Sequence, residues 1–387
     1  MKPVMVVVLV DALGWTLAGH DPAFAPRLSE RRALATVLGF SSGALPTAFT
    51  GRPPREHGRW LMYRRAAADS VFRGFEWLRL LPARLRRSWR LTQWLTGLVA
   101  RRGVRGYFNL YDVPRGELAE FDLPERDDIF VPGGLPGDSL WDALDRRGVA
   151  WQGWNWRTSE DDARRFALEA LARGQHDFLF LYSATLDARL HHEGSQGAGV
   201  RRCLDLWSGW FDDAAGAAAR GGREAWLYLC SDHGMVDVTA SVDVMGRLDA
   251  LAFQRGRDYV AFFDSTFARF WWRTPGARDA VRAALDAEPR GRWLSAADLA
   301  REGADFADHR YGEDLFLLEP GTLMVPSYMG LRPVAAMHGY DPAHPDMAGV
   351  LAANRPLPAE VTHLSHLRGF LERELDALAA AGDAGAA

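Results

Sequence analysis

The sequence contains only two cysteines, Cys203 and Cys230, among its 387 residues. Two cysteines cannot form a disulfide framework, and Cys230 falls inside an apolar run, so we expect a protein of a reducing compartment, the cytoplasm. No stretch approaches eighteen apolar residues, so no membrane-spanning helix is predicted. The first apolar run ends at Asp11 without a small-residue cleavage pattern, which indicates a buried strand and not a signal peptide.

Internal repeats and low-complexity blocks are also missing, apart from an Ala/Gly-rich end after Leu378. With 48% hydrophobic and 25% charged residues, the composition is typical of a folded globular protein. We expect one catalytic domain over residues 1–378. Cap insertions are expected at about 59–132 and 237–331, and a flexible tail at 379–387.

Apolar runs alternate with helical patterns along the chain. The runs at 4–10, 178–182 and 226–230 are typical of central strands that are covered on both faces. Helices are predicted at 139–147 and 160–173, and a glycine follows each of them. This alternation predicts an α/β protein with a doubly wound, mostly parallel sheet, to which the insertions add a helical or α+β cap.

Three acidic residues closely follow the predicted strands. They are Asp11, Asp187 and Asp232. In doubly wound sheets, ligands bind beyond the carboxyl ends of the strands, so these carboxylates are expected to meet at one edge. An acid that ends a wholly apolar strand is costly unless it is paired or bound to a metal, although Asp11 could instead cap a following helix.

Two histidines accompany these acids. His191 lies four residues after Asp187, which places both side chains on one helical turn, where they can reach the same ion. His233 directly follows Asp232, and both can face one site only through an irregular backbone; we expect the conformational freedom of Gly234 to permit that turn. Taken singly, the first pair is more often structural, and the second is equally compatible with a loop salt bridge.

Two further features carry polar side chains suited to phosphate chemistry. Ser41 and Ser42 stand at the start of a predicted helix, where a hydroxyl would meet backbone N–H groups and a nearby cation would lower its pKa. His338 lies far along the chain in a turn-rich His-Gly-Tyr stretch. Considered alone, such features more often reflect helix capping, close packing or a structural histidine.

Together and in this order, the motifs resemble those of the alkaline phosphatase superfamily, in particular its type I phosphodiesterase/nucleotide pyrophosphatase branch. The resemblance rests on Asp11, on a serine nine residues before Thr50, and on the later D-x-x-x-H-x-x-G, D-H-G and H-G-Y motifs. It spans almost the whole chain, from Val4 to about Leu351. We therefore expect the fold and the two-metal chemistry of that superfamily.

By position, the resemblance implies two cation sites and a serine nucleophile. The first site would use Asp187, His191 and His338. The second would use Asp11, Asp232 and His233, with the nucleophilic oxygen as a further ligand. The nucleophile would be Ser41, or Ser42 if the alignment slips by one residue. The mixed oxygen and nitrogen ligands favour two zinc ions, with manganese as the alternative.

The sequence also departs from the family pattern. An asparagine that this branch commonly has three residues after the nucleophile is Ala44 here, which puts nucleotide specificity in doubt. The sulfatase motif, Cys or Ser followed by x-Pro-x-Arg, is absent around Ser41, so a formylglycine sulfatase is not expected.

The function predicted from the resemblance is metal-dependent hydrolysis of phosphate esters, chiefly as a phosphodiesterase or pyrophosphatase with a phosphoseryl intermediate. A phosphotransferase and a phosphomonoesterase that acts on a lipid or small-molecule phosphate are the alternatives, and a non-catalytic binding module is a third. The expected substrate is a phosphorylated small molecule or lipid head group. Nucleic acid is not expected to bind, because no groove-reading or stacking module accompanies the basic residues.

Residues 59–105 carry twelve arginines and only two acids, Asp69 and Glu76, whereas the whole chain has a net charge of -4. Six large apolar residues lie among the arginines, partly at helical spacing: Trp77, Leu81, Leu85, Trp89, Trp94 and Leu98. The favoured interpretation is a helical cap whose aromatic residues pack on the core while its arginines stay solvated. The alternative is a basic amphipathic surface that makes a peripheral contact with anionic lipid.

Overall fold

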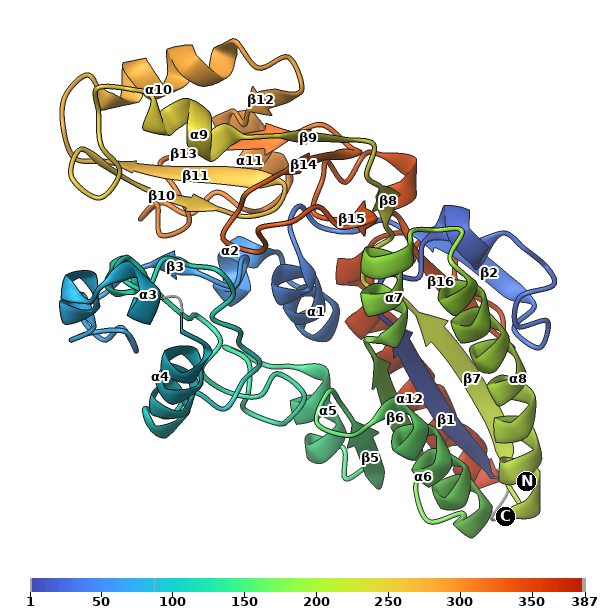
Figure 1. The fold of residues 1–387 in the computed structure, drawn as a ribbon. Helices are drawn as coiled ribbons and strands as arrows, with labels where there is room; N and C mark the ends of the chain where they lie inside the picture. The colour runs from blue at the N-terminus through green and yellow to red at the C-terminus, as the bar shows by residue number, and fades with distance from the viewer. Residues whose placement is uncertain (1, 87, 385–387) are drawn as a thin grey trace.

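The computed structural model describes residues 2–86 and 88–384. A six-stranded sheet lies at the centre of its larger part (Figure 1). In spatial order the strands are β2 (Glu30–Leu34), β16 (Gly349–Ala353), β7 (Glu224–Cys230), β1 (Pro3–Val10), β6 (Phe178–Ser183) and β5 (Trp151–Trp154). Strands β7, β1, β6 and β5 are parallel, whereas β16 runs antiparallel to both β7 and β2. The predicted α/β class with a mostly parallel sheet is confirmed.

Helices cover both faces of this sheet, because the strands are apolar on both sides. Every residue of β1 is buried. Its even-numbered valines pack with α6 (Glu160–Arg173), α7 (Thr185–Glu193) and α8 (Ala198–Arg220). Its odd-numbered residues pack with α1 (Ser41–Thr50), α5 (Leu140–Arg146) and α12 (Leu367–Ala384). A continuous apolar run is the pattern expected of such a doubly covered strand.

Local signals define the helix ends well. Ser139 caps α5 in a capping box with Asp142, and Ser159 caps α6 through the amide of Asp162. At the other end of the chain, α12 continues through Ala384, because its alanine-rich last turns favour helix. The helix thus enters the segment expected as a tail at 379–387, of which 385–387 lie outside the described residues.

The two insertions form the parts that lie to the left in Figure 1. Helix α2 (Pro54–His57) follows α1 and precedes the first insertion, which holds β3 (Arg64–Arg65), η2 (Glu76–Leu80), α3 (Ala83–Arg86), α4 (Trp89–Arg101), η3 (Leu118–Glu120) and β4 (Phe121–Asp122). The second holds β9 (Ala240–Val242), α9 (Val244–Asp249), β10 (Tyr259–Phe263), β11 (Phe267–Trp272), α10 (Ala277–Asp286), β12 (Gly291–Trp293), α11 (Ala296–Arg301), β13 (Asp314–Leu318) and β14 (Thr322–Met324). Strands β10, β11, β13 and β12 form an antiparallel sheet.

The insertions share one hydrophobic core. Buried side chains of the first, such as Phe72 and Phe121, belong to the same cluster as Phe262 and Tyr328 of the second. Tyr63 stacks on Phe262 with ring centroids 4.9 Å apart. The cap is therefore a single packed unit that is built from two separate stretches of chain.

The remaining short elements lie outside the cap. They are η1 (Trp15–Gly19), β8 (Val236–Asp237), β15 (Ala336–Met337), η4 (Pro345–Met347) and η5 (Leu364–His366). Strands β8 and β15 pair with each other, and so lead His233 and His338 to the same place.

The aromatic residues of the first insertion do not pack on the core as expected. Leu78, Leu95 and Val99 fill the shared core, whereas Trp77 and Trp89 are exposed, as is Trp94. The prediction was wrong for these tryptophans. Helical spacing shows which apolar residues share a face of a helix, but it does not show which of these faces packs on the core. No helix of the described residues is both long and apolar enough to cross a membrane.

Candidate metal centre

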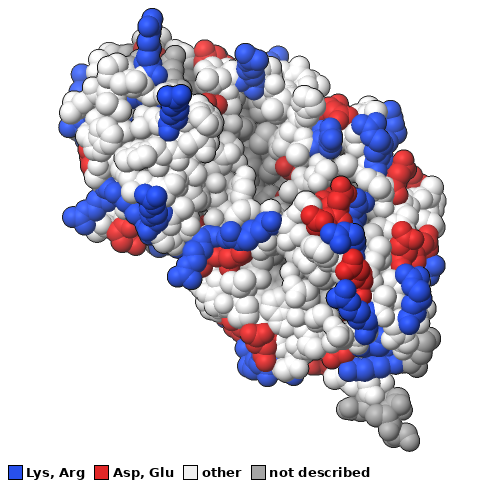
Figure 2. All heavy atoms as spheres, turned by 60° about the horizontal axis from the view of Figure 1, so that its bottom comes forward, with Lys and Arg blue, Asp and Glu red and all other residues white. Residues whose placement is uncertain are grey.

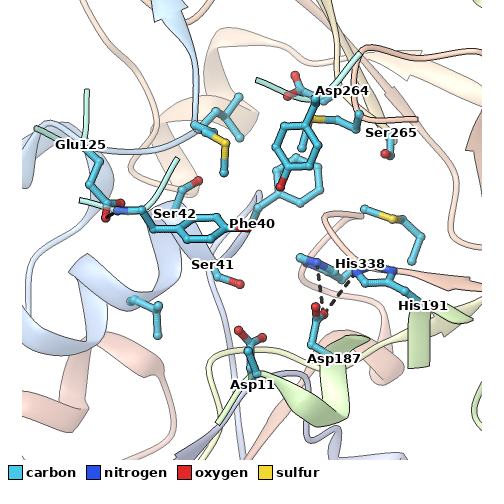
Figure 3. A pocket seen from close by; sticks show the side chains of 18 of the residues that line it. Asp11, Phe40, Ser41, Ser42, Glu125, Asp187, His191, Asp264, Ser265 and His338 are labelled. Carbon is cyan, nitrogen blue, oxygen red and sulfur yellow. Dashed lines mark hydrogen bonds and ion pairs between the residues drawn. The ribbon is translucent and has the colours of Figure 1, made fainter. Parts of the chain in front are cut away.

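Three neighbouring strands of the sheet deliver the acidic residues. Asp11 follows β1, Asp232 lies two residues after β7, and Asp187 lies in the first turn of α7, just after β6. Because β1 lies between β6 and β7, all three carboxylates reach the same edge. Figure 3 shows the carboxylates of Asp11 and Asp187 side by side, pointing into one space next to Ser41.

The first group of potential ligands comprises Asp11, Asp232 and His233, whose ligand atoms lie within 4.8 Å of one another. His233 Nε2 lies 3.3 Å from Asp11 Oδ1 and 3.4 Å from Asp232 Oδ2. His233 Nδ1 faces the carbonyl oxygen of Gly234 at 2.9 Å and therefore carries the ring proton in the neutral form. The lone pair of Nε2 then faces the two carboxylates.

The second group comprises Asp187, His233 and His338, again within 4.8 Å. His338 Nε2 is 3.7 Å from Asp187 Oδ1, and its ring stacks on His233 with centroids 3.9 Å apart. His191 joins through Asp187, with Nε2 at 3.3 Å from the same oxygen (Figure 3). Its Nδ1 donates to the carbonyl of Ala336 at 2.8 Å, which orients Nε2 towards the carboxylate.

The geometry thus brings together all six side chains that the resemblance implied as ligands. It differs in one respect, since His233 lies in both close groups and His191 lies in neither. Their role as metal ligands stays a prediction.

The electrostatics of the cluster fit a bound cation. Asp11 Oδ1, Asp187 Oδ1, Asp232 Oδ2 and His338 Nδ1 are buried without a hydrogen-bond partner among the described residues. Burial, with Asp232 and Asp187 nearby, raises the pKa of Asp11 well above its ordinary value. Burial and the neighbouring His233 and His191 lower the pKa of His338 far below its ordinary value. Clustered acids beside imidazoles form a donor set suited to divalent ions such as zinc.

The backbone around the acids is constrained by close packing. Ala12 has a φ of 62°, which is uncommon for a residue with a side chain, and its amide donates to Asp232 Oδ1 at 3.4 Å. Gly234 does not have a positive φ, so the expected reason for this glycine was wrong. A Cβ at Gly234 would lie 2.0 Å from the carbonyl oxygen of Asp346, so the glycine is needed for close approach.

The two serines face different ways. Ser41 Oγ lies 3.0 Å from His233 Nε2 and so touches the cluster. Ser42 Oγ instead donates to the carbonyl of Trp60 at 3.0 Å, and Figure 3 shows it pointing away from the acids. Both stand at the start of α1, where no described residue accepts from their amides. The geometry favours Ser41 over Ser42 as the reactive hydroxyl.

Sequence reasoning missed Tyr182, the penultimate residue of β6. Its hydroxyl donates to Asp11 Oδ2, the oxygen that faces away from His233. The parallel register, which places Leu9 beside Tyr182, brings the two together. The signal in the sequence was a tyrosine, an aromatic residue with a polar hydroxyl, at the end of an apolar strand. Its partner depends on how the two strands pair, which the sequence does not state.

A cavity of about 440 Å³ opens from the cluster towards the cap. Both serines line it, together with apolar and aromatic residues that include Leu61, Met62, Tyr107, Tyr111, Phe130, Trp156, Met324 and Met329. Glu125 and Arg59 add charge, and burial raises the pKa of Glu125 to about 7 although Arg59 opposes the shift. The cavity is therefore polar at the acids and largely apolar beyond Ser41.

Comparison with solved structures identifies the fold. An inactive threonine-to-alanine variant of murine ectonucleotide pyrophosphatase/phosphodiesterase 5, in complex with AMP, has a TM-score of 0.65 and 16% identity over 97% of this chain and 95% of its own. The murine protein without this substitution has a TM-score of 0.64 and 16% identity, over 96% of this chain and 95% of its own. The human protein has a TM-score of 0.64 and 14% identity, over 97% of this chain and 95% of its own.

At this level of identity, the likeness establishes the fold. The chain has the alkaline phosphatase-like α/β fold of these nucleotide pyrophosphatase/phosphodiesterase structures, as the motifs predicted. No protein-family model matches the sequence, and a search of curated proteins gave no match.

Proposed function

We propose that the protein is a metal-dependent phosphoester hydrolase that uses Ser41 as its nucleophile, chiefly on phosphodiesters or pyrophosphates. One observation carries this proposal: Ser41 Oγ lies 3.0 Å from His233, in a cluster of three acids and three histidines at the carboxyl edge of the sheet. The fold shared with the nucleotide pyrophosphatase/phosphodiesterase structures supports it. So does the inactivity of the murine threonine-to-alanine variant.

The residues present define the roles in this reaction. Asp11, Asp232, His233, Asp187, His191 and His338 would hold two divalent cations, zinc by preference. When bound, such ions neutralise phosphoryl charge and lower the pKa of a hydroxyl. Tyr182 orients Asp11, and the carbonyl of Ala336 orients His191.

Ser41 performs the covalent step. Attack of its Oγ on phosphorus forms a Ser41–phosphate ester as the bond to the leaving-group oxygen breaks. The hydroxyl proton passes to solvent, the leaving group is an alcohol or a phosphate, and water then hydrolyses the ester in a second step. The unbonded amides at the start of α1 are suited to hold a non-bridging phosphoryl oxygen.

The cavity supports a substrate with an organic group on the far side of the phosphate. Its wall beyond Ser41 consists largely of apolar and aromatic side chains, among them Tyr107 and Tyr111. These side chains can cover an aromatic or apolar ester group, whereas a phosphate without an organic group would make few favourable contacts with them. A nucleotide is one candidate, since AMP occupies the murine structure.

Turnover of chromogenic esters tests the proposal. With zinc-reconstituted protein, we expect bis-p-nitrophenyl phosphate and p-nitrophenyl phenylphosphonate to be cleaved faster than p-nitrophenyl phosphate. Ser41→Ala should lower kcat by about 10³-fold or more, because the covalent route is lost. Product analysis with added alcohols separates hydrolysis from phosphotransfer.

Ser42→Ala is the matched control, since Ser42 occupies the next position and donates to Trp60. It should change kcat by less than about tenfold, because its hydroxyl points away from the cluster. Equal activity of Ser41→Ala and the unsubstituted protein would refute Ser41 as the nucleophile.

A further inference from the structure

We infer that the outer face of the first insertion binds the surface of an anionic phospholipid bilayer. This Trp/Arg face consists of exposed large apolar residues and unpaired arginines on η2, α3 and α4: Trp77, Leu80, Leu85, Trp89, Trp94, Arg79, Arg84, Arg90 and Arg101. The inference does not depend on the proposed hydrolase activity.

The apolar part of the face is concentrated and exposed. The side chains of Trp77, Leu80, Leu85, Trp89 and Trp94 are exposed by 44%, 79%, 53%, 72% and 53%. Trp77 and Trp94 meet edge to face with ring centroids 6.5 Å apart, which joins η2 to α4. Apolar groups gathered in this way mark an interaction surface, and tryptophan in particular favours the interface between water and lipid.

Helix α4 has the two faces that such a contact needs. Leu95 and Val99 lie in the shared core of the cap, and Leu91 and Leu98 pack against it. The opposite face presents Trp89, Arg90, Gln93, Trp94, Gly97 and Arg101 to solvent. Because the inward face is already satisfied by the core, the outward tryptophans are not needed for packing within the chain.

The charge of the face selects an anionic partner. Arg79, Arg84, Arg90 and Arg101 are exposed, and no acid of the described residues forms an ion pair with any of them. Elsewhere many exposed arginines are paired, for example Arg165 with both Asp162 and Glu169. In Figure 2 the left of the view, where the insertions lie, shows several basic side chains and fewer acidic ones on a largely uncharged surface. Arginines near an anionic leaflet each add to binding.

A second copy of the chain fits this face less well. In a two-fold contact the same patch meets itself, so the unpaired arginines would face arginines. A bilayer that contains phosphatidylserine offers phosphate and carboxylate groups to the arginines and an interfacial layer to the indoles at the same time.

Vesicle sedimentation tests the inference without any measurement of turnover. The full chain should sediment with phosphatidylcholine vesicles that contain phosphatidylserine, much less with pure phosphatidylcholine, and less as salt is raised. Arg79→Gln/Arg84→Gln/Arg90→Gln should weaken binding by about 100-fold, the loss expected for three arginines near an anionic surface. Trp89→Ser/Trp94→Ser should weaken it by about tenfold or more.

Control variants on α8 carry the same changes far from the face. Arg201→Gln/Arg202→Gln/Arg220→Gln and Leu206→Ser alter exposed residues and should leave binding unchanged. Circular dichroism shows whether each variant is folded, and quenching of tryptophan fluorescence by brominated lipids tests the unsubstituted protein without any variant. Three results would overturn the inference: absence of quenching, equal sedimentation with neutral vesicles, or a dimer in light scattering that the tryptophan variant abolishes.

Discussion

At the scale of single residues, the buried side chain of His57 makes the stability of the protein depend on pH. Its ring is fully buried, with Nε2 donating to Thr47 Oγ1 at 3.0 Å and Nδ1 accepting from the amide of Arg59 at 3.3 Å. Protonation of Nδ1 would break the second bond. Burial, and then the nearby positive charge of Arg59, lower the pKa of His57 from 6.5 to about 3.

Stability should therefore fall as the medium becomes acidic. Between about pH 6.5 and pH 3 the unfolded chain protonates His57 and the folded chain does not, so the free energy of unfolding rises with pH in this window. The slope from this residue is up to about 1.4 kcal/mol per pH unit. In urea titrations, the loss of stability from pH 7 to pH 5 should be about 2 kcal/mol smaller in His57→Leu than in the unsubstituted protein.

His344→Leu is the matched control, because His344 is only half-buried and lies in a turn that it caps itself. This variant should not reproduce the effect of His57→Leu, because His344 is not enclosed as His57 is. The same pH dependence in all three proteins would contradict the role given to His57.

At the scale of elements, a buried arginine forms an ion pair within the second insertion and a hydrogen bond to the first. Arg269 of β11 is fully buried, and its Nε lies 2.7 Å from Asp264 Oδ2. Its Nη1 donates to the carbonyl of Tyr63 at 2.8 Å, which ties the second insertion to the first. Burial raises the pKa of Asp264 even though Arg269 opposes the shift, which shows how strongly the site disfavours an unpaired charge.

Loss of Arg269 should be costly. Arg269→Met would leave Asp264 buried without its partner and lower the free energy of unfolding by about 3–5 kcal/mol. Arg278→Met, which removes a partly exposed partner of Asp314, should lower it by no more than about 1 kcal/mol. Urea unfolding followed by circular dichroism compares the two, and similar losses would argue against a structural role for the buried pair. Asp264→Asn/Arg269→Met should recover part of the loss.

The sequence predicted elements whose signals are local. The spacing of Asp187 and His191 predicted a shared helical turn, and both lie on α7. Contacts that depend on distant pairing could not be read in the same way: Tyr182 meets Asp11 only through the register of β6 on β1. The need for Gly234 likewise arises from a carbonyl more than a hundred residues later.

At the scale of the whole molecule, the metal centre should contribute to stability. The potential ligands lie on α7 or directly after β1, β7 and β15, so a bound cation would tie together segments far apart in sequence. Zinc at about 100 times its Kd should raise the free energy of unfolding by about 2.7 kcal/mol, and chelation should reverse the gain. Differential scanning fluorimetry measures this as a shift in Tm.

Asp232→Asn should lose most of the zinc-dependent shift, because it removes a ligand charge from the cluster. Asp346→Asn, a change of the same kind in the neighbouring loop, should keep it. A Tm that does not respond to zinc in the unsubstituted protein would exclude a stabilising metal.

The cap has one interior although its halves are separated by more than a hundred residues of chain, from Leu123 to Val242. Neither half can be lost, shortened or exchanged by itself without exposing the apolar side of the other. Variation in the wall of the cavity should therefore arise in pairs of compensating changes, one in each stretch. Anyone who grafts a new specificity onto this scaffold must transplant both stretches as a matched set.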